Sequence, residues 1–158
     1  MRRGEREVTD RAEMLEILES CDVCRLGLVD TAAASPEAYI VPMNFGIEVD
    51  GGRLTLWFHC ASEGRKLDII KRGGTVTFEA DCRHELMTGN TACEWSYRYA
   101  SVMGKGRLTI ADGELKAYGL DRIMSHYGSA GMHAFNDRAM KAVTVLRLDV
   151  TDITCKRH

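Results

Sequence analysis

The most informative part of the sequence is residues 54–67, LTLWFHCASEGRKL. Alternate apolar residues at Leu54, Leu56 and Phe58 predict a half-buried strand with these three side chains on one face. The residues from Cys60 to Gly64 predict a short break, and a helix is expected to begin directly after them. The sequence therefore predicts a strand, a loop and a helix in immediate succession.

The predicted loop and helix start carry side chains suited to a phosphorylated aromatic ligand. The strand would deliver Phe58 and His59 into the loop, where Ser62 adds a hydroxyl. Loop amides and a helix N-terminus attract an anion, and Arg65 and Lys66 would neutralise a phosphate there. A surface turn with solvated charges is the alternative, because Ser, Arg and Lys are common at helix starts.

Length and composition are those of one ordinary globular domain. A chain of 158 residues has the usual size of one domain, so a single domain over 1–158 is expected. The net charge is −2, from 21 basic and 23 acidic residues, which provides no broad basic surface for nucleic acid. The sequence has no apolar run of the length that a membrane span requires, and a cytoplasmic protein is expected.

Six cysteines in a cytoplasmic protein are expected to be thiols or ligands rather than disulfides. Cys21 and Cys24 have the two-residue spacing of redox pairs and zinc sites, and Cys82 and His84 would be further ligands. A zinc ribbon needs a second Cys-x-x-Cys, which this sequence lacks. A thioredoxin-like pair lies between a strand and the next helix, whereas this pair lies between a predicted helix and the next strand. Structural thiols without a metal are therefore expected, and metal binding is the alternative.

The longest strand signal is the alternation from Tyr39 to Val49. The odd-numbered positions of this run are all apolar, and the even-numbered positions include proline, asparagine, glycine and glutamate. Pro42 cannot donate a hydrogen bond to a neighbouring strand, which predicts an edge position or a bulge. Asp50-Gly51-Gly52 then predicts a hairpin turn into the strand that contains residues 54–58.

The remaining elements follow from the same periodicities. The apolar positions change phase along one long strand, which predicts a bulge near Ala100 and Ser101. The polar stretch from Arg83 to Glu94 is expected to be irregular. The predicted helices are 10–20, 64–72, 112–127 and 136–141, and the other predicted strands are 23–29, 76–82, 96–110 and 142–153. Strands joined by hairpins, with helices between some of them, predict a mainly β (α+β) fold, a small barrel with peripheral helices.

Three blocks of the sequence together resemble a known family. They are VPMNFG at 41–46, FHCASEGRK at 58–66 and SVMGKG at 101–106. In this order and spacing they resemble the pyridoxamine 5'-phosphate oxidase-like flavoproteins, and more closely the Nim-type branch of 5-nitroimidazole reductases or resistance proteins. The resemblance covers nearly the whole chain, from Arg3 to about Ile153.

The resemblance implies a split β-barrel homodimer that binds FMN in two clefts between its subunits. By position, it implies that Arg65 and Lys66 bind the FMN phosphate, that Phe58 and His59 lie beside the flavin, and that Ser101 points toward the isoalloxazine edge. His59, near the reactive side of the flavin, is the expected catalytic residue. The expected cofactor-binding residues are Val41, Pro42, Met43, Asn44, Phe58, His59, Ser62, Arg65, Lys66 and Ser101.

Two departures from the oxidases argue against vitamin B6 oxidation. Their C-terminal substrate-binding residues have no match here, and neither does the arginine that they carry on the second strand. We therefore expect an FMN-dependent oxidoreductase that reduces small electron-poor aromatics such as nitroimidazoles, with His59 as the proton donor. One alternative is a flavin store, sensor or carrier in which His59 only packs at a strand end. Another is a metal-binding protein that uses Cys21, Cys24, Cys82 and His84.

Overall fold

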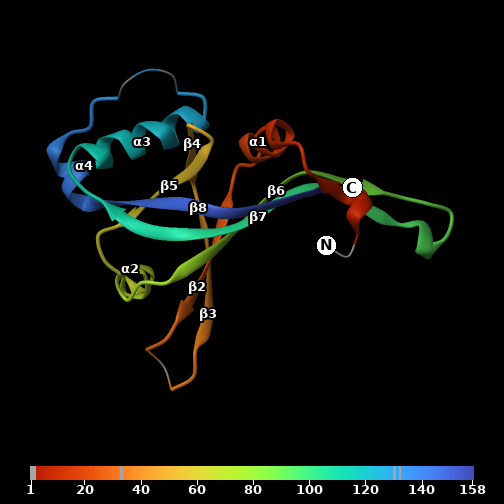
Figure 1. The fold of residues 1–158 in the computed structure, drawn as a ribbon, viewed down its shortest axis with the longest axis horizontal. Helices are drawn as coiled ribbons and strands as arrows, with labels where there is room; N and C mark the ends of the chain where they lie inside the picture. Colours follow the sequence, from red (N-terminus) through yellow and green to blue (C-terminus); the bar gives the residue numbers. More distant parts are fainter. Residues whose placement is uncertain (1–2, 33, 130, 132) are drawn as a thin grey trace.

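The computed structural model describes residues 3–32, 34–129, 131 and 133–158. One antiparallel sheet has the order β3-β2-β6-β7-β8-β5-β4, and the short strand β1 pairs with β8 (Figure 1). The strands are β1 (Glu7–Val8), β2 (Cys24–Asp30), β3 (Glu37–Met43), β4 (Phe45–Asp50), β5 (Arg53–Ala61), β6 (Thr75–Met87), β7 (Ser96–Ala111) and β8 (Val143–Arg157). The helices are α1 (Arg11–Glu19), α2 (Arg65–Lys71), α3 (Glu114–His126) and α4 (Asp137–Ala142), with the 3-10 turns η1 (Gly4–Arg6) and η2 (Ala92–Glu94).

The sheet closes on itself at Asn44. β3 and β4 lie at opposite ends of the strand order, yet Asn44 alone separates them in the sequence, so the sheet must curl until its ends meet. β3 pairs with β2, whereas β4 pairs with β5 across the predicted hairpin. The prediction of one strand over 39–49 is therefore wrong, because the chain changes partners at Asn44. Pro42 lies on an end strand, as its missing N–H predicted. The result is the expected mainly β split barrel with peripheral helices.

Apolar side chains fill the interior of the barrel. Leu54, Leu56 and Phe58 of β5 are buried there together with Phe45 of β4 and Phe78 of β6. Each such side chain contributes roughly 1.5–3 kcal/mol when it is fully buried. The alternation in the sequence therefore identifies the inward face of β5 correctly.

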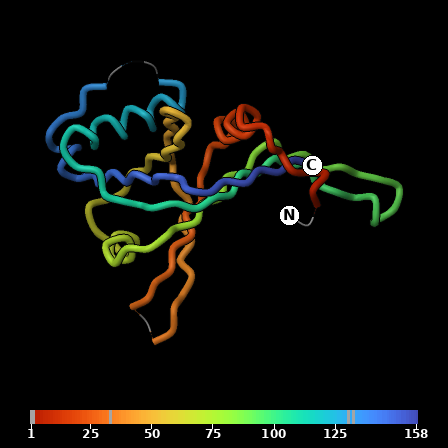
Figure 2. The backbone as a smooth tube through the Cα atoms, viewed as in Figure 1, coloured from red at the N-terminus to blue at the C-terminus, as the bar shows by residue number. Residues whose placement is uncertain are grey.

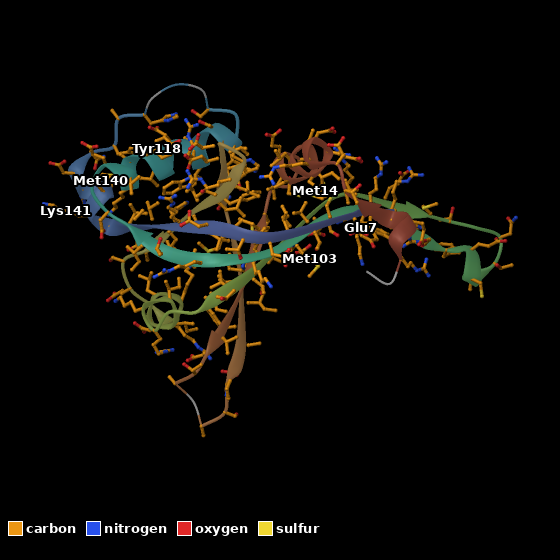
Figure 3. All side chains as sticks on the ribbon, in the orientation of Figure 1. Glu7, Met14, Met103, Tyr118, Met140 and Lys141 are labelled. Atoms are coloured by element: carbon orange, nitrogen blue, oxygen red, sulfur yellow. The ribbon has the colours of Figure 1, made fainter. Side chains whose placement is uncertain are left out.

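The middle of the outward face of β5 is also buried, and α3 covers it at Trp57. Trp57 and Thr55 are 1% and 6% exposed, although they point away from the barrel interior. The Trp57 indole N–H donates to Glu48 Oε2 at 2.8 Å, and the Tyr118 hydroxyl of α3 donates to Glu48 Oε1 at 2.9 Å. Figure 3 shows Tyr118 on this helix. The prediction of a half-buried strand is wrong, since periodicity along a strand does not reveal which helix will cover it.

Two hairpins, β2–β3 and β6–β7, extend outward from the barrel (Figure 2). β6 continues to Met87, so the expectation of irregular structure over 83–94 is wrong for residues 83–87 and is confirmed for residues 88–91, which precede the turn η2. The bulge predicted near Ala100 occurs at this level of the sheet, but its extra residue belongs to β6. Cys82 pairs with Ala100 and Glu85 with Arg98, and Arg83 between them has φ 58°. In β7 itself the alternation continues, because Ala100 and Val102 are buried whereas Tyr97 is exposed on the other face.

The first and last helices begin where side-chain caps predict. Asp10 accepts the backbone N–H groups of Ala12 and Glu13 at 2.7 and 3.4 Å, which caps α1. Asn136 accepts the Ala139 N–H at 2.8 Å, which caps α4. The longest helix in the described chain is α3, with 13 residues. None of the helices in these ranges is long and apolar enough to cross a membrane.

Candidate functional site

The end of β3, the end of β5 and the start of α2 form one surface. β5 ends at Ala61, and α2 begins directly after Gly64. Gly64 has φ 126°, a backbone conformation that residues other than glycine rarely adopt. Lys66, in the first turn of α2, places Nζ 3.0 Å from the Sδ of Met43 on β3. This contact joins the sequence blocks 41–44 and 58–66.

Arg65 is held by the β2–β3 hairpin. Its Nε donates to Asp30 Oδ2 at 3.0 Å, and its Nη2 pairs with Glu37. The guanidinium also lies 5.0 Å from the ring centroid of Tyr39. The charge of Arg65 is therefore already paired with two carboxylates before any phosphate binds. The sequence alone does not predict this pairing.

Sequence reasoning misses Asp30, Glu37 and Arg72. Asp30 and Glu37 lie opposite each other on β2 and β3, and like charges in this position destabilise a strand pair. Arg65 and Arg72 supply the balancing cations, and Arg72 Nη2 donates to Asp30 Oδ1 at 2.6 Å. The Ala32 N–H, and then the Arg65 guanidinium, hold the pKa of the Asp30 carboxyl below its ordinary value. The strand register, which composition does not give, is the signal that could have revealed this group.

Lys66 is the cation of this surface that has no carboxylate partner among the described residues. Its side chain is half-buried, and its contact, the Met43 thioether, is a weak acceptor. Partial desolvation, and then the Lys66 ammonium, lower the pKa of His59. Lys66 therefore keeps the capacity to bind an anion, and the His59 imidazole lies within its field.

The neighbouring residues Phe58 and His59 point in opposite directions, because side chains alternate along a strand. His59 is exposed, as is Ser62 in the loop after β5. Phe58 is 0% exposed and packs near Phe45, with ring centroids 6.5 Å apart. The expectation that the Phe58 ring lies beside a ligand is therefore corrected: the ring supports the strand end from inside the barrel.

β3 presents a strand edge, whereas Ser101 lies elsewhere on the sheet. Val41 is half-buried, Pro42 is exposed and Met43 is buried, and β3 is an end strand. Ser101 is half-buried on β7, three strands from β3. At ~4.8 Å between neighbouring strands, that separation is roughly 14 Å along the sheet. Within one subunit, Met43 and His59 therefore lie near Lys66, whereas Ser101 lies apart from them.

The residues of the metal alternative have the environment of structural thiols. The Cys21 and Cys82 thiols both donate to the Ile17 carbonyl, at 3.2 and 3.6 Å. Burial raises the pKa of the Cys24 thiol to about 12 and raises the pKa of Cys21 still further, whereas a metal requires thiolates. His84 pairs with a carboxylate of β6 at 2.6 Å. In the described ranges, no group of three or more His, Cys, Asp or Glu side chains is placed to hold a metal ion.

Comparison with known proteins identifies relatives of this arrangement. The family model for pyridoxamine 5'-phosphate oxidase matches residues 10–157. A Bacteroides thetaiotaomicron protein, provisionally named a 5-nitroimidazole antibiotic resistance protein, is 31% identical with a TM-score of 0.79, and the match covers 96% of this chain and 86% of that chain. No curated protein matches the sequence.

Two more distant structures share the fold. An FAD- and haem-binding protein of Mycobacterium smegmatis is 20% identical with a TM-score of 0.78, over 96% of this chain and 73% of that one. The flavocytochrome Anf3 of Azotobacter vinelandii is 19% identical with a TM-score of 0.77, over 100% and 72% of the two chains. At these identities the likeness concerns the architecture alone.

Proposed function

This chain belongs to the pyridoxamine 5'-phosphate oxidase family, and we propose that it is an FMN-dependent oxidoreductase that reduces small electron-poor aromatics such as nitroimidazoles. The observation that carries the proposal is the position of Lys66. Its ammonium lies 3.0 Å from the Met43 Sδ, and after desolvation it is the second cause that lowers the pKa of His59. A cation for a phosphate is thus next to a strand edge suited to a planar ring. The name of the Bacteroides relative supports the substrate class.

The side chains on this surface fit a phosphorylated flavin. Lys66 would bind the phosphate, with the exposed Ser62 hydroxyl as a further donor. Arg65, whose charge is already paired, would orient the phosphate rather than neutralise it. The backbone of 41–44 would lie along the ring and offer its polar groups, except for the N–H that Pro42 lacks. A bound flavin supplies the redox chemistry, while the protein positions it and tunes its electronics.

His59 would donate a hydrogen bond or a proton to the substrate. It is exposed at the end of β5, and its lowered pKa favours the neutral imidazole, which still carries one N–H donor. Reduction of a nitro group consumes protons, so a positioned imidazole is suited to relay them. In the alternative function, a flavin store, sensor or carrier, His59 would have no such effect on turnover.

We also propose a homodimer, because one subunit leaves Ser101 apart from Lys66. Ser101 of the partner subunit would complete the flavin cleft. Exposed apolar side chains support burial of the outer sheet face: Ile40 of β3 is 68% exposed and Met103 of β7, labelled in Figure 3, is 56% exposed. Light scattering should give twice the mass of the 17.6 kDa chain. A monomer across micromolar concentrations would contradict this part of the proposal.

Flavin titration tests the phosphate site. Lys66→Ala should weaken FMN binding about tenfold or more, because a hydrogen bond to a charged group contributes roughly 1.5–3 kcal/mol. Riboflavin, which lacks the phosphate, should bind the variant and the native protein equally. Lys71→Ala is the matched control, since Lys71 is an exposed lysine in the last turn of the same helix. Unchanged FMN affinity in Lys66→Ala would refute the site, and no flavin binding by the native protein would refute the cofactor.

Anaerobic stopped-flow kinetics separate the reductase from a flavin store, sensor or carrier. The reduced flavoprotein should be reoxidised rapidly by a nitroimidazole. His59→Ala should keep FMN yet slow this reaction by about 10²-fold or more, while reoxidation by dioxygen should change little. A yellow protein that does not react with nitroaromatics would support the non-catalytic alternative instead.

A further inference from the structure

A second group of polar side chains lies at the C-terminal end of α3. Ser129 Oγ is 2.8 Å from His133 Nε2, and His133 Nδ1 is 2.8 Å from Asp121 Oδ1. Asp121 belongs to α3, and the other two residues follow this helix in the sequence. A hydroxyl, an imidazole and a carboxylate joined in this order form the arrangement that activates a serine nucleophile.

The hydrogen bonds determine which nitrogen of His133 carries the proton. Asp121 Oδ1 also accepts the backbone N–H of His133 at 3.0 Å. Burial raises the pKa of Asp121, but the hydrogen bonds from the His133 ring and backbone outweigh it, so the net shift is downward. An ionised carboxylate only accepts, which makes Nδ1 the donor and leaves Nε2 of a neutral imidazole as an acceptor. The Ser129 hydroxyl therefore donates to a base.

Neighbouring groups on the same helix lack this arrangement. Ser125 Oγ donates to the Asp121 carbonyl at 2.8 Å, and a carbonyl cannot remove its proton. His126 Nε2 faces the Cys21 carbonyl at 2.8 Å, so this nitrogen acts as a donor rather than as a base. Ser125 therefore serves as a matched control for Ser129.

The three side chains are both anchored and accessible. The Ser129 N–H donates to the Met124 carbonyl at 3.0 Å, which holds Ser129 against the end of the helix. The side chains of His133 and Asp121 remain 20% and 19% exposed, so solvent is not fully excluded from them. The Phe135 ring centroid lies 6.2 Å from that of the imidazole and offers an apolar contact to an acyl group.

We propose that Ser129 is a nucleophile that small carboxylic esters acylate, with His133 as its base and Asp121 as a positioning residue. Ser129 Oγ attacks the ester carbonyl carbon while its proton passes to His133 Nε2. The bond between the carbonyl carbon and the leaving oxygen then breaks, and that oxygen takes the proton. Water, activated by the same nitrogen, hydrolyses the acyl-serine, releases the carboxylic acid and restores the hydroxyl.

Reaction of the whole chain with p-nitrophenyl acetate tests this proposal. Release of p-nitrophenolate should be at least about 10²-fold faster than with Ser129→Ala, and peptide mass spectrometry should find the acetyl group on Ser129. Ser125→Ala should react like the native protein. His133→Gln should lose the acceleration. Ser129→Cys should keep a reactive nucleophile, and its reaction with the ester checks that a substitution at this position leaves the segment folded. The outcome should be the same with and without bound flavin.

The split between rate and binding tests the role of Asp121. Asp121→Asn should lower the maximal rate of acylation and leave the ester concentration at half-maximal rate unchanged, because Asp121 acts through the orientation of His133 and does not touch the ester. Asp121→Glu, which keeps the carboxylate, should restore part of the rate, whereas a purely structural role for Asp121 would not produce this split. Equal rates for the native protein and Ser129→Ala, or acetylation confined to lysines, would overturn the proposal.

Discussion

The two halves of the run 39–49 differ in how they are covered. β4 pairs with β5 and lies under α3 (Figure 1), where a Cβ added to Gly46 would be 2.4 Å from backbone atoms of Arg122 and Ile123. β3, at the other end of the strand order, pairs with β2, and its Ile40 side chain is 68% exposed. A similar alternation of residues thus leads to two different environments on either side of Asn44.

The two environments have different roles. The part under α3 stabilises the barrel, whereas the part around β3 is available to a ligand or to a partner subunit. The first residues of β4, Phe45 and Gly46, are both buried, so contacts restrict them. Lys66 contacts the buried Met43 at the end of β3, and the exposed His59 lies at the end of β5, where strand ends, loop and helix start meet. We therefore expect substitutions in the covered half to change stability, and those in the uncovered half to change binding.

The largest expected effect comes from Phe58→Ala. Phe58 is 0% exposed inside the barrel, and truncation of such a ring costs about 3–5 kcal/mol of unfolding free energy. Within one subunit Ile40→Ala should cost about 0.5 kcal/mol or less, and it should cost more at concentrations where the proposed dimer buries Ile40. Urea unfolding at several protein concentrations measures both variants. A loss in Ile40→Ala that stays small at every concentration would count against burial of β3 by a partner subunit.

A smaller effect should separate two strand glycines. Gly46→Ala would place a methyl group against the α3 backbone, which cannot move aside, and should cost roughly 1–3 kcal/mol. The Cβ of Gly27→Ala would meet Thr77 Oγ1 at 2.5 Å, and a hydroxyl can rotate away. The second variant should therefore stay within about 0.5 kcal/mol of the native protein. Thermal unfolding of the pair compares them, and equal losses would contradict the idea of unequal coverage.

Local patterns were sufficient to predict most of the fold. Hairpin turns, helix caps and alternation depend on nearby residues, so the element order and the inward face of β5 follow from the sequence. The change of partners at Asn44 and the burial of Trp57 under α3 do not, because both depend on contacts between distant segments. The bulge near Ala100 lies on β6 rather than on β7, and periodicity in one strand does not show which partner carries the extra residue.

The candidate site was predictable in part. The juxtaposition of Met43 and Lys66 agrees with the motifs that suggested one site. The pairing of Arg65 with Asp30 depends on strand register, and the inward direction of Phe58 depends on which face becomes the core. Motifs identify which residue types occur together, whereas charge balance and side-chain direction require the three-dimensional arrangement.

Acid should weaken the charge cluster of the β2–β3 hairpin. The pKa of Asp30 is lowered in the folded chain, so the unfolded chain, with its ordinary value near ~3.9, binds the proton first. The stability from this carboxylate is complete above that value and is lost as pH falls through the folded pKa. Asp30→Asn should thus be less stable than the native protein at neutral pH, with a gap that closes in acid. Urea unfolding across this range measures it, and Asp112→Asn, at an exposed position, is the control. A gap that stays constant with pH would contradict the charge pairing.

The smallest expected effect is a change in the titration of His59, which NMR can follow with His59→Gln for assignment. Desolvation and then Lys66 lower the pKa of His59, so Lys66→Met should raise that pKa while the desolvation remains. Lys71→Met should leave it unchanged. FMN should act in the same direction as Lys66→Met, because its phosphate would neutralise the ammonium, whereas riboflavin should not reproduce that part of the shift. If neither Lys66→Met nor FMN moves the pKa, Lys66 and His59 do not act as one site, and the uncovered half of the barrel loses its proposed role in binding.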